Sequence, residues 1–232
     1  MSEGFAQAFR MIAGLDRELF EIILLSIRVS FTAVVLAVLV ALPFGAVLAI
    51  GRFAGRRALI VLMNAMMGLP PVVVGLALYL LFSRSGPLGV LEFLYTPTAM
   101  IIAQMVLVIP IVAAISRQVI ADMHAEYDEM LRALGASRLQ ILCTIGWEAR
   151  NALLTVALAG LGRALSEVGA VMIVGGNINH VTRVMTTAVA LETSRGNLGL
   201  ALALGLILLV LSLMVNTAVA LLRNEGREVA HA

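Results

Sequence analysis

Five long apolar stretches dominate this 232-residue sequence and limit what it can fold into. They cover residues 22–50, 58–82, 98–115, 152–175 and 198–222. A helix that crosses a bilayer needs about 20 mostly apolar residues, and each stretch reaches or approaches that length. The composition agrees, because 61% of the residues are hydrophobic and 13% are charged, against about 45–50% and about 25% in soluble domains. The sequence therefore predicts an all-α fold, a polytopic membrane helical bundle with about five transmembrane helices.

The residue types that carry common enzyme chemistry are missing or lie in the wrong places. All 16 basic residues are arginine, so neither a lysine-containing phosphate-binding loop nor a Schiff-base lysine is available. Cys143 is the only cysteine, which excludes an intrachain disulfide and a CxxC metal site. HExxH and GxSxG motifs are absent, and the three histidines lie outside the apolar stretches. We therefore expect no catalysis, metal or cofactor on this chain, and the net charge of +2 gives no reason to expect a nucleic-acid partner.

The arginines between the stretches predict how the chain is oriented. With the N-terminus outside, nine arginines fall on the inner side and five on the outer side. Cytoplasmic loops are the arginine-rich ones, so we expect an external N-terminus and a cytoplasmic C-terminus. We divide the chain into a short interfacial segment over 1–21, a transmembrane domain over 22–223 with a cytoplasmic loop over 116–151, and a tail over 224–232.

The loop over 116–151 is polar but is not a turn-rich linker, because it contains no proline. Its pattern predicts a helix over 126–134, a break at Gly135, and a second helix that Ser137 caps and that continues to residue 145. Two interpretations stay open. The hairpin is either a solvated surface feature or an element that docks on another protein, since an apolar face outside the membrane has to be buried against something.

Gly68-Leu69-Pro70-Pro71 interrupts the second stretch. Proline removes a backbone donor and bends a helix, and within lipid this is tolerated where neighbouring groups or a cavity satisfy the freed carbonyls. The bend either lines a pathway or serves helix packing.

Arg163 and Glu167 stand four residues apart in the fourth stretch, so a continuous helix would place them on one face. Arg163 would lie about 16 Å from the start of the span, near the middle of the membrane, where charges are expensive. Glycines surround the pair, among them Gly169, and permit close helix contact. The pair is either an ion pair that locks packing or a pore-lining pair that controls an anion path.

The segment before the last stretch is expected to be external and is rich in hydrogen-bond donors. Backbone amides, hydroxyls and arginines bind oxyanions well, although any exposed loop contains such groups. The candidate residues for an external mouth are Gly176, Asn177, Thr182, Arg183, Thr186 and Thr187.

Residues 129–137 read Glu-Met-Leu-Arg-Ala-Leu-Gly-Ala-Ser and resemble the EAA motif of ABC importer permeases. That motif begins Glu-Ala-Ala and has a glycine after three more residues, a spacing that Glu129 and Gly135 keep. Ile145 falls where the motif has its trailing hydrophobic residue. The chain departs from the motif in having Met-Leu for the two alanines and Trp-Glu for the final Leu-Pro.

The resemblance implies a coupling helix that seats in a groove of a separate ATP-hydrolysing subunit. Leucine and alanine side chains, expected to be exposed, would bury against that subunit, while a glutamate would pair with one of its basic groups. A glycine would allow the tight turn. The implied docking residues are Glu129, Leu131, Leu134, Gly135, Ala136, Ser137 and Leu139.

A second similarity covers most of the chain, from residue 19 to residue 216. Residues 162–170 and 176–178 resemble the sulfate, molybdate and tungstate branch of these permeases, and residues 68–76 and 185–193 are most similar to the tungstate permeases. The resemblance implies the fold of a type I ABC importer permease. It also implies a translocation path whose candidate residues are Arg163, Glu167, Gly169, Pro70 and Pro71.

The family resemblance further implies an assembly in the inner cell membrane. Two copies of the chain would form a homodimer in lipid, with two ATPase chains that bind ATP and Mg below it and an extracytoplasmic substrate-binding protein above it. The implied function is that of the permease of an ATP-driven oxyanion importer. Tungstate is the first candidate substrate, and molybdate and sulfate are the alternatives. An ion-coupled secondary transporter is a weaker alternative, because such carriers usually contain internal repeats.

Overall fold

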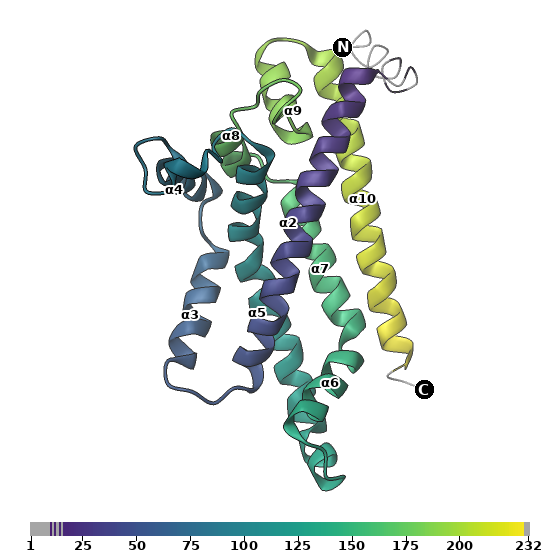
Figure 1. Ribbon diagram of the computed structural model, residues 1–232. Coiled ribbons are helices and arrows are strands. Elements are labelled where there is room, and N and C mark those ends of the chain that lie inside the picture. Colours follow the sequence, from purple (N-terminus) through teal and green to yellow (C-terminus); the bar gives the residue numbers. More distant parts are fainter. Residues whose placement is uncertain (1–9, 11, 13, 15, 230–232) are drawn as a thin grey trace.

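A computed structural model describes residues 10, 12, 14 and 16–229 of this chain, and all its long regular elements are α-helices (Figure 1). The predicted all-α bundle is confirmed. In chain order the elements are α2 (Arg17–Ile50), α3 (Arg56–Met67), α4 (Pro71–Phe82), the short 3-10 helix η1 (Gly89–Leu91), α5 (Pro97–Ala133), α6 (Arg138–Glu148), α7 (Arg150–Leu165), α8 (Gly169–Gly175), α9 (Met185–Ser194) and α10 (Leu198–Val229). Most of the predicted interfacial segment lies outside the described residues, and α2 already begins at Arg17.

Three helices, α2, α5 and α10, are each long and apolar enough to cross a membrane, and two bent helix pairs raise the possible total to five. The Asp16 carboxylate caps the start of α2 by accepting from the backbone N–H of Glu18 at 2.9 Å. At the other end, the N–H of Gly51 donates to the carbonyl of Val47 at 2.8 Å and closes the helix. The described helices therefore agree with the predicted number of spans.

The second apolar stretch does not form one straight span. It consists of α3 and α4, two 12-residue helices that meet at an angle of 103°. Pro70 has extended backbone angles, and Pro71 begins α4 at a position where its missing N–H is harmless. Each half is about 18 Å long, too short to cross a bilayer by itself.

The fourth stretch is also broken, contrary to the prediction of one helix over 152–175. Helix α7 ends at Leu165 and α8 begins at Gly169. Ser166 contributes to the break, because its hydroxyl donates to the carbonyls of Gly162 and Arg163, each at 3.0 Å. Helix α6 approaches α7 at 66° on the other side, so this part of the chain changes direction twice.

Helices α2, α5, α7 and α10 run side by side along the bundle, with α3 beside α5 (Figure 1). The short helices α4, α8 and α9 gather at the end where α2 begins, and α6 lies at the opposite end with the end of α10. Small residues allow α2 and α5 to approach closely: a Cβ on Gly45 would lie 2.9 Å from the carbonyl oxygen of Ala113. The core follows the length of this helix pair, with clusters around Met100, Val112 and Ile145.

Candidate functional site

The turn between α5 and α6 forms at the predicted glycine. Gly135 has a φ of +76°, in the left-handed region that glycine adopts without strain. Ser137 then begins α6 with a capping box, in which its hydroxyl accepts from the N–H of Gln140 at 3.4 Å and the Gln140 side chain accepts from the Ser137 N–H at 2.8 Å. The predicted helix, break and capped second helix are confirmed, although α6 continues beyond residue 145 to Glu148.

The apolar residues of this hairpin divide into two groups. Leu131 and Ala136, which were expected to be exposed, are half-buried and pack on a small cluster that includes Ile120, Ile141 and Ile145. That expectation is wrong because these two side chains hold α5 and α6 together.

The second group is open to solvent. Leu134 is 76% exposed and Leu139 is 71% exposed, and Met130 next to them is 53% exposed. We call these three residues the turn surface. Glu129, Gly135 and Ser137 are also exposed there. Met130 was predicted to share a helix side with Leu131 and Leu134 but was not among the implied docking residues.

The predicted ion pair forms, but not within one helix. The Arg163 guanidinium donates to the Glu167 carboxylate at 2.7 Å, and Glu167 lies beyond the end of α7. Glu167 is 4% exposed, and its other carboxylate oxygen accepts from the N–H of Ala170 at 3.1 Å. Its backbone carbonyl accepts from the Thr186 hydroxyl at 2.9 Å. Glu167 therefore joins the end of α7, the start of α8 and the start of α9.

The two helix breaks lie next to each other. A Cβ on Gly169 would lie 2.8 Å from Cγ2 of Val72, the residue after Pro71. A Cβ on Gly75 would lie 2.8 Å from the Cα of Ala170, so α4 and α8 touch backbone to backbone. The structure thus brings Gly169, Glu167 and Pro71 into one region, while the Arg163 side chain keeps 35% of its surface exposed there.

The donor-rich segment before α10 is not an open loop. Asn177, Thr182, Arg183, Thr186 and Thr187 are all buried, and only Gly176 among the six predicted mouth residues is exposed. The Asn177 and threonine side chains bond to one another or to the backbone: the Asn177 amide donates to the carbonyl of Thr187 at 3.2 Å. The Thr187 hydroxyl lies 2.9 Å from the Asn177 amide oxygen. These side chains therefore stabilise the α8–α9 end.

Arg183 is enclosed by acidic side chains that sequence reasoning did not connect with it. Its guanidinium lies 3.3 Å from Glu18 of α2 and 4.0 Å from Glu192 of α9. Glu192 also pairs with Arg195 at 3.2 Å. The N–H of Met185 donates to a serine hydroxyl of α2, which ties α9 to that helix. Periodicity gave no signal for the two contacts with α2, because their partners are 165 and 159 residues apart in the chain.

No group of three or more potential metal-ligating side chains exists among the described residues. The arrangement is therefore a packed membrane bundle with an apolar turn surface at one end, two adjoining helix breaks around Arg163, and a buried polar network at the other end.

Comparison with known proteins identifies the architecture. Residues 41–225 match the family described as binding-protein-dependent transport system inner membrane component. The chain is 40% identical to the tungstate uptake system permease protein TupB of Peptoclostridium acidaminophilum, over 97% of this chain and 99% of that protein. It is 35% identical to TupB of Campylobacter jejuni, over 92% and 90% of the two chains. The sulfate transport system permease protein CysT of Escherichia coli is 31% identical over 77% of this chain and 67% of that one.

A solved structure shows the same fold. A chain of the inward-facing MetNI methionine ABC transporter superposes with a TM-score of 0.59 at 19% identity, and the match covers 92% of this chain and 97% of that one. This chain therefore belongs to the family of binding-protein-dependent transport system inner membrane components, the permeases of ABC importers, and it is a transport subunit rather than an enzyme.

Proposed function

We propose that this chain is the membrane permease of an ATP-driven tungstate importer. The observation that carries the proposal is the 40% identity to a tungstate uptake permease over nearly the full length of both chains. The likeness to the sulfate permease is lower, at 31%, and covers less of the chain. In the proposed assembly two copies of the chain pair in the inner membrane, a substrate-binding protein delivers the oxyanion, and two partner ATPase chains bind ATP and Mg.

The α5–α6 turn is the proposed docking element for the ATPase. The turn surface of Met130, Leu134 and Leu139 is apolar and lies beyond the apolar part of α5, so a partner protein would remove it from water. Glu129 beside it is free to meet a basic group of the partner. The excess of arginines at this end supports a cytoplasmic location, with the start of α2 outside.

Helix α5 is the proposed connection between ATP hydrolysis and the path. It is one 37-residue helix, about 55 Å long at the α-helical rise, that begins beside α8 and ends at the turn. A displacement of the turn by the closing ATPases would therefore reach the α4 and α8 breaks through a single rigid element.

Arg163 is the proposed anion-contacting residue. Its guanidinium has five donors, of which one bond goes to Glu167, and a third of the side chain is exposed. An oxyanion that leaves water beside Pro70 and Gly169 would find charged donors there. Glu167 keeps the arginine in place and does not itself need to meet the anion.

The substrate is tested by uptake in proteoliposomes that contain the permease, its ATPase and its binding protein. We expect ATP-dependent accumulation of tungstate at low concentration, with molybdate and sulfate competing weakly. Sulfate competing as well as tungstate would contradict the tungstate assignment, and uptake driven by an ion gradient without ATP would contradict the importer itself.

The role of Arg163 is tested by the double variant Arg163→Gln plus Glu167→Gln. The glutamine at position 167 can still accept from the Ala170 N–H, and the double change leaves no orphaned charge, so we expect a stable transporter that takes up tungstate poorly. Uptake equal to that of the unmodified transporter would mean that the pair is only a packing element.

A further inference from the structure

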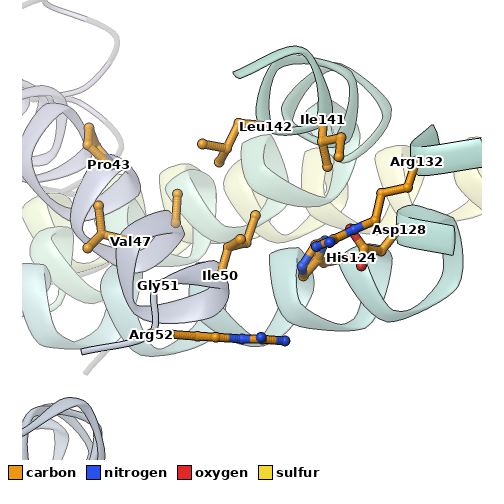
Figure 2. A pocket seen from close by; sticks show the side chains of 11 residues that line it. Pro43, Val47, Ile50, Gly51, Arg52, His124, Asp128, Arg132, Ile141 and Leu142 are labelled. Carbon is orange, nitrogen blue, oxygen red and sulfur yellow. The ribbon is translucent and has the colours of Figure 1, made fainter. Parts of the chain in front are cut away.

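A hollow of about 710 Å³ lies near the α5–α6 end, between parts of the chain that are distant in sequence. Its walls come from the end of α2, the lower part of α5 and the first turns of α6 (Figure 2). In Figure 2 apolar side chains occupy one side of the hollow, and His124, Asp128 and Arg132 cluster on the other. The hollow has no part in the proposed path, which lies at the α4 and α8 breaks.

The apolar wall of the hollow belongs to the membrane-spanning part of α2. Pro43, Val47 and Ile50 line it, and they extend about 10 Å along the helix from its end. Pro43 is exposed and Val47 is 56% exposed. They continue an exposed apolar stripe that includes Leu36 and Val40 at helical spacing. The hollow therefore continues the exposed apolar face of α2, a helix that is long and apolar enough to cross a membrane.

The polar rim of the hollow carries excess positive charge. Arg132 pairs with Asp128 at 2.8 Å, so these two charges balance. Arg52, two residues after the end of α2, has no hydrogen bond or ion pair to any residue that the structure describes, although Asp128 is close enough to attract it electrostatically. Nδ1 of His124 is buried without a hydrogen-bond partner, 3.6 Å from Asp128. The ring nitrogen is closed off from the hollow, so the exposed guanidinium of Arg52 is the group that remains for an anionic ligand.

A second, shallower hollow adjoins this rim. It has a volume of about 560 Å³, shares Gly51 and Arg52 with the first, and is also lined by Arg56 and Arg57. Arg56 is occupied, because its guanidinium donates to the carbonyls of Leu48 and Ala49 at 2.7 and 3.0 Å. Arg52 thus lies between the apolar wall of the larger hollow and a basic loop, by which we mean the segment over 52–57 that leads into α3.

We propose that the larger hollow binds an anionic phospholipid of the adjoining leaflet. One acyl chain would lie against Pro43, Val47 and Leu142, and the phosphate would meet the exposed guanidinium of Arg52. A docked ATPase fits less well, because water-soluble chains do not reach the spanning part of α2. A free phosphate fits less well too, because it would leave the apolar wall empty. The proposal does not depend on which oxyanion is transported.

The test is native mass spectrometry of the complete transporter, purified with its ATPase chains and titrated with phosphatidylglycerol or phosphatidylcholine. We expect one phosphatidylglycerol per permease chain, bound about tenfold more tightly than phosphatidylcholine, since a charge-assisted contact distinguishes the two head groups. Arg52→Gln should remove this preference. It should not affect folding, because Arg52 has no contact to lose.

Arg57→Gln is the matched control. Arg57 is exposed at the start of α3, five residues after Arg52, and carries the same charge, but it does not line the larger hollow. The preference for phosphatidylglycerol should persist in this variant. An equal loss in both variants would mean that the basic loop attracts lipid only diffusely, and the proposed site would be rejected.

Ala46→Phe tests the apolar wall separately. Ala46 lines the hollow and is half-buried, so the larger ring would fill the space of the acyl chain while Arg52 stays in place. We expect the Ala46→Phe variant to lose its tightly bound phosphatidylglycerol. In the unmodified transporter, we expect that inorganic phosphate does not compete with phosphatidylglycerol. Competition by phosphate would identify a free-anion site instead. Release of the lipid whenever the ATPase is bound would identify a protein contact. Either result would overturn the proposal.

Discussion

The two ends of the bundle use polar and apolar residues in opposite ways. At the α8–α9 end, Thr182, Thr187 and Glu192 are buried and bonded within the chain. At the α5–α6 end, Leu134 and Leu139 are exposed, and only a small cluster joins the two helices. The comparison teaches that residue polarity alone does not identify a binding surface here. Apart from Nε of Arg183, the buried side-chain donors of the donor-rich segment are bonded within the chain, whereas the leucine-rich turn is left without a partner within the described chain.

Glu167→Leu should produce the largest loss of stability, because two bonds depend on its buried carboxylate. The variant leaves Arg163 without its partner, and it removes the acceptor of the Ala170 N–H at the start of α8. We expect the free energy of unfolding in detergent to fall by about 3–5 kcal/mol. Thr193→Ala, at an exposed position of α9, is the control and should change it by less than about 0.5 kcal/mol. A similar small change for Glu167→Leu would mean that the network at this end does not stabilise the bundle.

Thr187→Val should have the next largest effect. The side chain is fully buried, and its loss leaves the Asn177 amide oxygen without its hydrogen bond. The expected decrease is about 1–3 kcal/mol, measured by the same unfolding experiment. Ser194→Ala, at an exposed position of α9, should be close to neutral. If both variants lowered the free energy of unfolding equally, burial of the Thr187 hydroxyl would not be the reason for its effect.

Gly135→Ala should have a smaller effect, of backbone origin. No atom lies within 4 Å of the new Cβ, so the change introduces no clash. The φ of +76° makes alanine unfavourable by about 1–2 kcal/mol. Gly146→Ala is the matched control, because that position is also open but lies within α6, and there alanine should stabilise by about 0.5–1 kcal/mol. Equal results for the two alanines would show that the turn tolerates another backbone conformation.

The spans and the α5–α6 hairpin could be predicted from local patterns in the sequence. Apolar length identifies a membrane helix, and Gly135 followed by the Ser137 capping box marks where one helix ends and the next begins. The Arg163–Glu167 pair was found for the same reason, because a four-residue spacing is a local signal.

The helix breaks and the buried network could not be predicted in full, because they depend on long-range contacts. The break at Ser166 occurs inside an apolar stretch, where Glu167 is bonded by both α8 and α9. Burial of Arg183 depends on Glu18, which lies 165 residues away in the chain. A single sequence does not reveal such partners, so the segment was interpreted as an exposed mouth.

Co-purification of the ATPase with a turn-surface variant tests the central claim most directly. Leu134→Asp plus Leu139→Asp places two charges at residues that are 76% and 71% exposed, so the permease itself should fold and insert normally. Leu131→Ala, at the half-buried position of the same hairpin, is the control that weakens packing without charging the surface. We predict that the double variant loses the ATPase and all ATP-dependent tungstate uptake while the permease remains intact in the membrane. Full retention of the ATPase by the double variant would contradict the assignment of this end as the docking surface.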